Sequence, residues 1–285
     1  MKSDLLLTLK EKMPTFSKGQ KKIATYLIEH FDKAAFLTAS KLGKAADVSE
    51  STVVRFASEI GFEGYPQLQS ALQEVSRNML TAVQRMEVAS SNIDADDVLN
   101  KVLYSDIEKI RKTLEEIDKK DFDSAVDAII NAKNIYIIGT GSAAVLANFL
   151  TFYLNHIFDN IKTIGSTSLN DVFENILSID EKDVLIGFSF PRYSNRTLKA
   201  MRYAKECNAT VVAITDSESS PIANLASHLL IARSDMASFV DSLVAPLSLI
   251  NALIVALGLN RKDEVSHKLH KLEKLWQEND VYGQN

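Results

Sequence analysis

The sequence is poor in cysteine and carries no excess of positive charge. Its 285 residues include one cysteine, Cys207, which excludes a disulfide within the chain and a zinc site built on several cysteines. The formal net charge of −5 argues against a uniformly basic protein that coats nucleic acid. The composition, with 46% hydrophobic and 24% charged residues, is that of a folded protein rather than a disordered one. At this length two domains are expected.

The sequence also has little that resembles a membrane segment or a secretory signal. One segment, 242–259, has 18 residues without a charge but contains Pro246, Ser248 and Asn251. That length is the lower limit for a membrane-spanning helix, so we interpret the segment as a buried core helix or a dimer-interface helix. Residues 1–5 have the pattern of a helix start and not of a signal peptide. We therefore expect a cytoplasmic protein without a membrane segment.

Charge is distributed unevenly along the chain. Residues 1–80 contain 11 basic and 9 acidic residues, a net of +2, whereas the rest contains 21 basic and 28 acidic residues, a net of −7. The N-terminal part is therefore the better candidate to approach a phosphate backbone. The pattern of apolar residues divides the chain in the same way. We expect an all-helical domain over 1–80, a helical connector over 81–131 and an α/β domain over 132–285.

Residues that cap helices indicate a helix-turn-helix within 1–80. Ser17 and Gln20 fit a capping box for a first helix. Two shorter helices follow, capped by Thr38 and Ser49, and Gly61 should end the second of them. Their expected ranges are 39–46 and 50–60, joined by the turn 47–49. Two short helices joined by a three-residue turn are the signature of a helix-turn-helix.

The second helix of this motif carries a polar face suited to DNA. Such a helix enters the major groove, where hydroxyls can bond bases or phosphates and an arginine can grip guanine. The candidate DNA-binding residues are Lys41, Lys44, Ser49, Ser51, Thr52 and Arg55. On the other side, Val53, Val54 and Phe56 are expected to pack on the preceding helix. The alternative is an ordinary capped helix with a surface arginine.

The connector contains apolar residues at helical spacing. They are Val98, Val102, Ile107, Ile110, Leu114 and Ile117, and the residues between them are rich in Asp, Glu and Lys. This pattern predicts an amphipathic helix. We expect it to pack on the second domain, and the alternative is a free lever between the domains.

From Asn134 onward, short apolar strands alternate with helices. The strand candidates are 135–139, 161–164, 184–189, 210–215 and 228–232. Helices are expected over 143–158, 170–177, 195–207, 222–226, 243–259 and 262–278. Strands that are apolar, rich in β-branched residues and separated by helices predict a doubly wound parallel sheet.

Two strand-to-helix turns of this sheet offer an anion site. Glycines let the backbone approach a ligand, and a helix N-terminus supplies free N–H groups and a partial positive charge. Both turns leave the carboxyl edge of the sheet, where ligands bind in open α/β folds. The candidate residues are Gly139, Gly141, Ser142, Ser189, Arg192 and Ser194. The alternative role of the three serines is helix capping, and that of Arg192 is a surface salt bridge.

Two motifs in the N-terminal region resemble a known family. Residues 48–56 read Val-Ser-Glu-Ser-Thr-Val-Val-Arg-Phe, and residues 61–65 read Gly-Phe-Glu-Gly-Tyr. With the stretch that begins at Phe16, they resemble the N-terminal domain of the RpiR (MurR/RpiR) family of bacterial sugar-responsive regulators. The resemblance implies binding to a palindromic DNA operator, altered by a sugar-phosphate metabolite. We expect a homodimer that buries segment 242–259, and the pairing of dimers into tetramers stays open.

The C-terminal half resembles the sugar isomerase (SIS) domain that RpiR regulators carry. Gly139-Thr140-Gly141-Ser142 matches its first loop, and Thr215-Asp216-Ser217 with Ser220-Pro221-Ile222-Ala223 matches its fourth strand and the next turn. The second loop departs from the usual Ser-x-Ser-Gly-x-Thr, because residues 189–194 read Ser-Phe-Pro-Arg-Tyr-Ser. The resemblance implies a phosphorylated sugar or a related anion as the effector. Arg192 could supply a bidentate contact to its phosphate or carboxylate.

Catalytic residues are hard to identify in this half. Isomerisation of a sugar phosphate needs a base close to a substrate carbon. None of the histidines lies in either candidate loop; they are His30, His156, His228, His267 and His270. His267 and His270 could share a metal, but no third ligand is evident and an exposed helix face is the better interpretation. We therefore favour a regulator without catalytic activity, cofactor or metal, and a phosphosugar isomerase with an accessory helical domain is the alternative.

Overall fold

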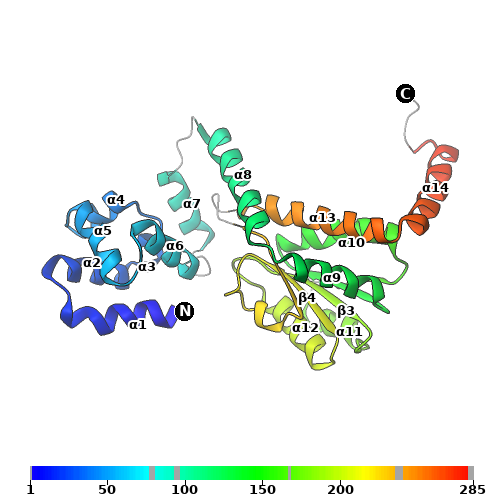
Figure 1. Cartoon of the computed structure of the whole chain (residues 1–285), viewed down its shortest axis with the longest axis horizontal. Helices are drawn as coiled ribbons and strands as arrows, with labels where there is room; N and C mark the ends of the chain where they lie inside the picture. Colours follow the sequence, from blue (N-terminus) through cyan, green and yellow to red (C-terminus); the bar gives the residue numbers. More distant parts are fainter. Residues whose placement is uncertain (1, 77–80, 93–96, 166–167, 235–239, 282–285) are drawn as a thin grey trace. The chain divides into compact units, whose positions relative to one another are not determined.

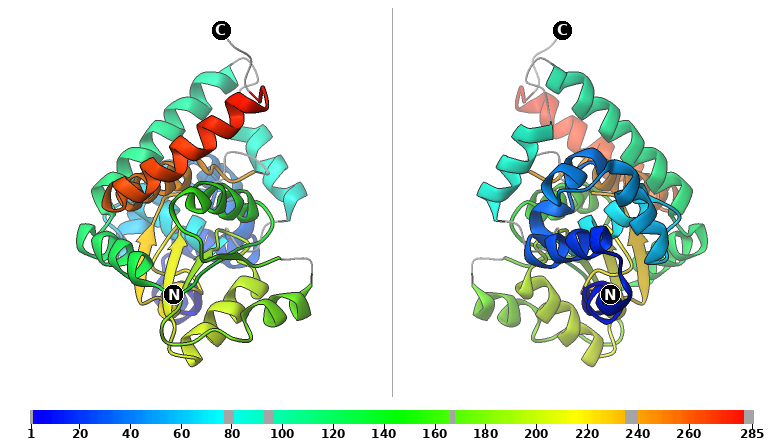
Figure 2. Two further views of the ribbon diagram at one scale, coloured as in Figure 1. Left: turned by 90° about the vertical axis from the view of Figure 1, so that its right-hand side faces the viewer. Right: turned by 90° about the vertical axis from the view of Figure 1, so that its left-hand side faces the viewer.

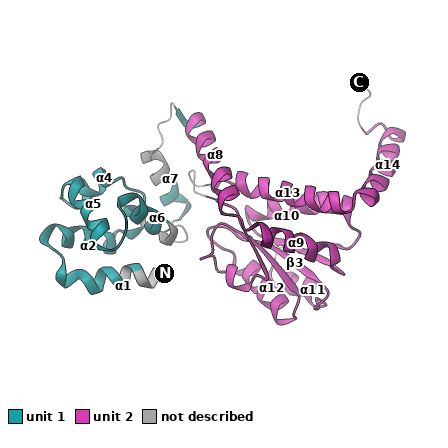
Figure 3. Ribbon diagram, in the orientation of Figure 1, with its two compact units in different colours: residues 1–98, 236–240 teal, residues 99–235, 241–285 magenta. Residues whose placement is uncertain are grey.

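Separate hydrophobic cores divide the chain into two units. The structure, a computed structural model, describes residues 2–76, 81–92, 97–165, 168–234 and 240–281. Unit 1 comprises residues 1–98 and 236–240, and unit 2 comprises residues 99–235 and 241–285 (Figure 3). Unit 1 has one core cluster of its own, whereas the core of unit 2 has two clusters.

Unit 1 is helical, as expected (Figure 1). Its elements are α1 (Lys2–Lys12), the 3-10 turn η1 (Met13–Thr15), α2 (Lys18–Glu29), α3 (Phe31–Ala34), α4 (Ala39–Ala45), α5 (Glu50–Glu59), α6 (Tyr65–Ser76) and α7 (Ala82–Asn92). The capping box is present at the start of α2, where the Ser17 side chain accepts from the Gln20 amide and the Gln20 side chain from the Ser17 amide. The predicted caps Thr38 and Ser49 accept from the amides of Lys41 and Thr52.

The turn between α4 and α5 is a tight C-terminal cap. The Val48 amide donates to the Gly43 carbonyl at 2.8 Å, and the Asp47 amide donates to the Lys44 carbonyl at 3.3 Å. Asp47 has a φ of +53°, the left-handed conformation that this cap requires. Gly43 is the contact point, because a Cβ there would lie 2.9 Å from the Val48 carbonyl oxygen. A side chain at position 43 would therefore push the turn away from α4.

The core of unit 1 joins α2, α4, α5 and α6. Val53 and Phe56 are fully buried, and Phe56 stacks edge to face with Phe16 at 5.3 Å between ring centroids. Burial of such a side chain stabilises a fold by about 1.5–3 kcal/mol. The packing prediction for Val54 is wrong, because this side chain is 42% exposed. Val54 follows Val53 by about 100° around the helix and so turns away from the core.

Unit 2 is an α/β domain (Figure 1). Its helices are α8 (Val98–Glu116), α9 (Lys119–Asn131), α10 (Ala143–Ile157), α11 (Leu169–Ile176), α12 (Asn195–Glu206), α13 (Val244–Asn260) and α14 (Lys262–Glu278), with the 3-10 turn η3 (Ala223–Leu225). Its strands are β1 (Ile135–Gly139), β2 (Ile161–Thr163), β3 (Val184–Phe188), β4 (Thr210–Thr215) and β5 (His228–Ile231). The expected strands are all present, and the expected helix 222–226 is only a 3-10 turn.

The five strands form one parallel sheet in the order β2-β1-β3-β4-β5. The central pair is in register with Ile137 opposite Ile186 and Gly139 opposite Phe188. The chain leaves β1 toward β2 on one side and returns to β3 on the other. The strand order therefore reverses between β1 and β3, and this switch point is where open α/β sheets bind ligands.

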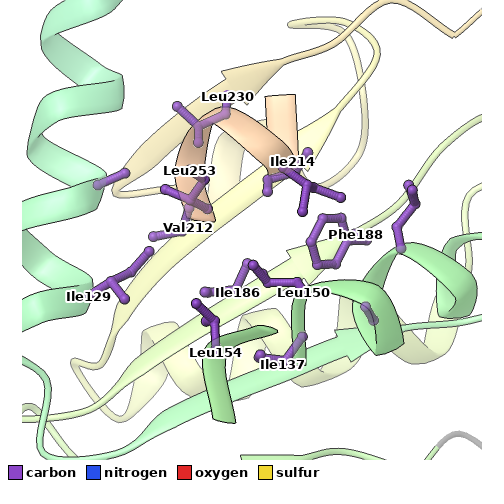
Figure 4. Close-up of a cluster of buried hydrophobic side chains, with 14 of the residues drawn as sticks. Ile129, Ile137, Leu150, Leu154, Ile186, Phe188, Val212, Ile214, Leu230 and Leu253 are labelled. Atoms are coloured by element: carbon purple, nitrogen blue, oxygen red, sulfur yellow. The ribbon is translucent and has the colours of Figure 1, made fainter. Parts of the chain in front are cut away.

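Helices cover both faces of the sheet, which confirms the doubly wound prediction (Figures 1 and 2). One face packs on α9, α10 and α13 (Figure 4), where Ile129, Leu150 and Leu253 meet side chains from β1, β3 and β4. The other face packs on α11 and α12 through Val172, Ile176 and Met201. The sheet is thus buried on both sides, which explains its continuous apolar strands.

The uncharged segment 242–259 forms most of α13, and one side of this helix lies in the core. Leu249, Ile250, Leu253 and Leu257 are buried, which agrees with a core helix. No single described helix is long and apolar enough to span a membrane. The pair α13 and α14 meets those criteria only when taken together, across a bend of 99°.

Candidate functional site

The first candidate site is the exposed face of α5. Ser49, Ser51 and Arg55 are exposed, and Thr52 is half-buried. The Ser49 hydroxyl lies 2.9 Å from that of Ser51 and 2.8 Å from that of Thr52, which gathers three hydroxyls at the helix N-terminus. The Arg55 Nε–H donates to the Ser51 carbonyl at 3.3 Å, so its stem lies along this face. These groups have the chemistry that base edges and phosphates require.

Thr52 differs from its neighbours because it packs against α2. A Cβ on Gly19 would lie 3.3 Å from the Thr52 Cγ2, so the start of α2 approaches the start of α5 closely. The sequence did not indicate this contact, because two helices separated by 20 residues carry no local sign of meeting. Because Lys18 precedes Gly19, this contact places the exposed Lys18 near the hydroxyl cluster. Lys18 is therefore a further candidate for a phosphate contact.

The lysines around the motif have different surroundings. Lys41 and Lys44 are exposed on α4, where they could reach a phosphate backbone. Lys22, which was not predicted, braces the turn with its Nζ 2.5 Å from an Asp47 carboxylate oxygen. That hydrogen bond and the positive charge lower the pKa of Asp47 below its ordinary value. The turn therefore keeps an ion pair at neutral pH.

The second candidate site begins where β1 ends. Gly139 has no room for a side chain, because a Cβ there would lie 2.5 Å from the Ala143 carbonyl oxygen. Gly141 has a φ of +62° and open space around its Cα. Ser142 is exposed and makes no capping hydrogen bond to α10, so its alternative role as a helix cap is wrong. Its hydroxyl stands at a helix N-terminus beside the switch point.

The loop after β3 faces this turn across the switch point. Ser189 is 2% exposed, and none of the described residues is placed to bond its Oγ. A buried hydroxyl without a partner costs about 1–3 kcal/mol, so a ligand oxygen at this point would remove a penalty. Ser194, by contrast, caps α12 by accepting from the Arg196 amide at 3.1 Å. Its alternative role is therefore present in the structure.

Arg192 occupies a strained position in the same loop. Its φ is +68°, a conformation that costs an ordinary residue roughly 1–2 kcal/mol and a glycine nothing. Position 192 corresponds to the glycine of the usual Ser-x-Ser-Gly-x-Thr pattern, and glycine adopts a positive φ without this cost. Arg192 is exposed. Strain of this kind persists where the surrounding structure holds it and often marks a functional loop.

Hydrogen bonds tie the loops of the second site together. The Tyr193 hydroxyl donates to an Asp216 carboxylate oxygen at 2.9 Å, and the Thr215 hydroxyl donates to the Ser189 carbonyl at 2.7 Å. The Thr140 hydroxyl lies 3.3 Å from that of the buried Thr197. The site thus includes the end of β4, where residues 215–217 resemble the SIS family but no site residue was predicted. These bonds hold the candidate residues on three neighbouring strand ends.

The histidines of unit 2 lie elsewhere. His228 begins β5, so it lies at the amino edge of the sheet and not at the carboxyl edge where the loops meet. Its Nδ1 is 3.0 Å from an Asp121 carboxylate oxygen, which joins β5 to α9. Within the described ranges no group of three His, Cys, Asp or Glu side chains is placed to hold a metal ion.

Known proteins share this arrangement of domains. The model of the helix-turn-helix domain of the rpiR family matches residues 3–78, and that of the SIS domain matches residues 128–256. An uncharacterized HTH-type transcriptional regulator of Caldanaerobacter subterraneus is 23% identical over 278 residues, which cover 96% of this chain and 97% of that one.

Solved structures of known proteins share the fold of this chain. The sugar isomerase domain of an RpiR transcription factor from Sphaerobacter thermophilus is 26% identical, with a TM-score of 0.59 over 62% of this chain and 99% of its own. The Vibrio vulnificus NanR protein complexed with ManNAc-6P is 22% identical, with a TM-score of 0.60 over 98% of this chain and 100% of its own. Relatives such as the Caldanaerobacter protein are named HTH-type transcriptional regulators, which supports the role of a regulator rather than an enzyme. Residues 3–78 are therefore a helix-turn-helix domain of the rpiR family, and residues 128–256 are a SIS domain.

Proposed function

We propose that this regulator binds an operator through α5 and releases or tightens it when unit 2 binds a phosphorylated sugar or a related anionic sugar metabolite. The DNA contacts would come from Lys41, Lys44, Ser49, Ser51, Thr52 and Arg55. The protein would act in the cytoplasm, as a homodimer or a tetramer on a palindromic operator. Two recognition helices of a dimer would then lie about 34 Å apart, or a multiple of that distance.

The main support for an effector site in unit 2 is the buried hydroxyl of Ser189 at the switch point, for which no described residue provides a hydrogen-bond partner. Around it, Gly141 leaves the backbone open and Ser142 offers a free hydroxyl at a helix N-terminus. Gly139, Arg192 and Ser194 complete the proposed site. Helix N-termini and hydroxyls favour an anion, and NanR, which shares this fold, is known complexed with ManNAc-6P. Phosphate is therefore the anionic group that we place there.

A paired binding assay tests the proposal. Gel-shift titrations on genomic fragments, with and without candidate sugar phosphates and sugar acids, identify an operator and an effector. Replacing Ser142 by Tyr should then abolish the response to the effector and leave operator binding intact, because the two sites lie in different units. Calorimetry should show the same loss directly.

The matched control is Ser178→Tyr. Ser178 is exposed and follows α11, whose end lies at the opposite edge of the sheet from the candidate loops. This variant should bind the effector as the parent does. If Ser142→Tyr also binds the effector as tightly as the parent, the proposed site is incorrect.

A further inference from the structure

Helix α8 packs on its own domain through polar side chains. The buried residues of α8 are Lys109 and Thr113, which are 3% and 7% exposed. By contrast, Ile107 and Leu114 in its apolar stripe are 57% and 75% exposed. This is the reverse of an ordinary amphipathic helix, which turns its apolar stripe to the core. The expected apolar packing of this helix on the second domain is therefore wrong.

Arg233 makes the contact at the C-terminal end of α8. It lies two residues after β5, so it leaves the same carboxyl edge of the sheet as the loops of the second candidate site. Its amide donates to the Thr113 hydroxyl at 2.9 Å, and its Nε–H donates to a Glu116 carboxylate oxygen, with which it forms an ion pair. Glu116 is the last residue of α8. The guanidinium thus holds the end of this helix to the sheet.

The same guanidinium reaches the second candidate site. The Nη1 of Arg233 lies 3.5 Å from the carbonyl oxygen of Asp216, the residue that follows β4. Asp216 is 1% exposed, and its carboxylate accepts from the Tyr193 hydroxyl at 2.9 Å. Polar contacts therefore connect loop 189–194 to the end of α8 without a break.

The two acceptors that Arg233 contacts are unequal. A guanidinium binds a carboxylate more strongly than a neutral carbonyl, because charge assists the hydrogen bond. Glu116 offers it a carboxylate and Asp216 its carbonyl, while the Asp216 carboxylate bonds Tyr193. A buried carboxylate that loses a donor is destabilised unless another donor replaces it. Loss of the Tyr193 hydroxyl should therefore draw the guanidinium from Glu116 toward Asp216.

We propose that Arg233 couples the effector site to α8 by exchanging the carboxylate of Glu116 for that of Asp216. The inference rests on the proposed function, in which an anion bound at loop 189–194 draws Tyr193 away from Asp216. The guanidinium then turns to Asp216 and releases the end of α8. Because α8 is the first helix of unit 2 along the chain, this release changes the element that follows unit 1 in the sequence. Arg233 is a positioning residue in this scheme and contacts no effector.

Hydrogen exchange of the full chain, followed by mass spectrometry without DNA or effector, tests the coupling. Tyr193→Phe removes the hydroxyl that bonds Asp216. It should speed exchange at the C-terminal end of α8 about two- to fivefold, the effect expected from the loss of one partly exposed ion pair. The matched control is Tyr203→Phe, which removes another tyrosine hydroxyl of unit 2, one that donates to the Leu177 carbonyl. The control should leave exchange in α8 unchanged.

A double-mutant cycle decides whether the effect passes through Glu116. Glu116→Gln weakens the ion pair at α8 itself, and it should fold as the parent does because Glu116 is exposed. In this background Tyr193→Phe should no longer speed exchange, since the contact that it releases is already weakened. Additive effects of the two substitutions would overturn the proposal, and so would a Tyr193→Phe variant whose α8 exchanges like that of the parent.

A second substitution at the site tests the role of charge. Tyr193→Phe combined with Asp216→Asn removes the negative charge that attracts Arg233, so exchange in α8 should return to the parent rate. Exchange that stays fast in this double variant would mean that Tyr193 acts on α8 through packing alone, which contradicts the exchange of carboxylates. No arm uses DNA or effector, so failure of the operator assay would count against the proposed function alone.

Discussion

Arg55 is the residue whose loss should most change the recognition of DNA sequence. It is exposed on α5 one turn after Ser51, where a guanidinium can reach a base edge in the major groove. If it grips guanine with two hydrogen bonds, Arg55→Ala should cost about 1–3 kcal/mol of specific operator binding. Fluorescence anisotropy at fixed salt would measure this loss against a duplex of scrambled sequence.

Lys41→Ala is the informative comparison for Arg55. An exposed lysine that contacts phosphate should weaken binding to both duplexes alike and reduce the slope of log affinity against log salt by about 1. If Arg55→Ala behaves in that way too, Arg55 is a backbone contact. The sequence readout would then have to come from the hydroxyl cluster of Ser49, Ser51 and Thr52.

Tyr65, the last residue of the Gly-Phe-x-Gly-Tyr motif, has a structural role. Its hydroxyl donates to the Leu37 carbonyl at 2.6 Å, and burial raises its pKa from 10 to about 12. A raised pKa in the folded state gives stability that is complete below pH 10 and is lost as the pH rises toward 12. Tyr65→Phe should cost about 0.5–1.5 kcal/mol at neutral pH.

The pH dependence separates this role from simple packing. Between pH 10 and pH 12 the unfolding temperature of the parent should fall more steeply than that of Tyr65→Phe, because the variant has no phenol to ionise at position 65. The difference in unfolding temperature between the two should therefore shrink across that window. Parallel curves would mean that the hydroxyl ionises as freely in the folded state as in the unfolded one.

At the scale of elements, the helix-turn-helix depends on the close approach of its turn to α4. In most exposed helices Gly→Ala stabilises by up to about 1 kcal/mol. Gly43→Ala should do the opposite and cost about 1–3 kcal/mol, because its Cβ would lie 2.9 Å from the Val48 carbonyl oxygen. Gly64→Ala is the control, since its nearest atom would be the Pro66 Cδ at an ordinary 3.7 Å. Denaturant unfolding of both variants decides whether the turn is as tight as described.

The elements that the sequence predicted well are those that local chemistry specifies. The strands of unit 2 are short apolar runs bounded by turn residues, and their observed ends lie within one residue of the expected ones. The caps Ser17, Thr38 and Ser49 were predictable because a cap bonds within its own first turn. Ser142 lies outside this rule, since its backbone is already helical and its hydroxyl bonds no amide of α10.

The elements that escaped prediction are those that depend on distant neighbours. The spacing of apolar residues in α8 predicted a helix but could not show which side of that helix is buried. In the structure the buried residues of α8 are Lys109 and Thr113. In the second site, loop position alone pointed to Ser189 and Arg192. The missing partner of the Ser189 hydroxyl and the left-handed backbone of Arg192 are properties of three strand ends held together, which no local pattern encodes.

At the scale of the whole molecule, regulation requires that binding to one unit change the binding free energy of the other. The operator would bind unit 1 and the effector unit 2, and each unit has its own core. If the effector changes operator affinity by some factor, linkage requires that the operator change effector affinity by the same factor. Such coupling is typically 1–3 kcal/mol, so we expect a change of about 5-fold to 150-fold in both directions.

Calorimetry can measure both sides of this cycle. The effector is titrated into the parent chain alone, with saturating operator duplex, and with a scrambled duplex of equal length. Only the operator should shift the effector dissociation constant, and by the factor seen when the effector is added to the operator complex. Equal effector affinity with and without operator would mean that the ligand of unit 2 does not control DNA binding.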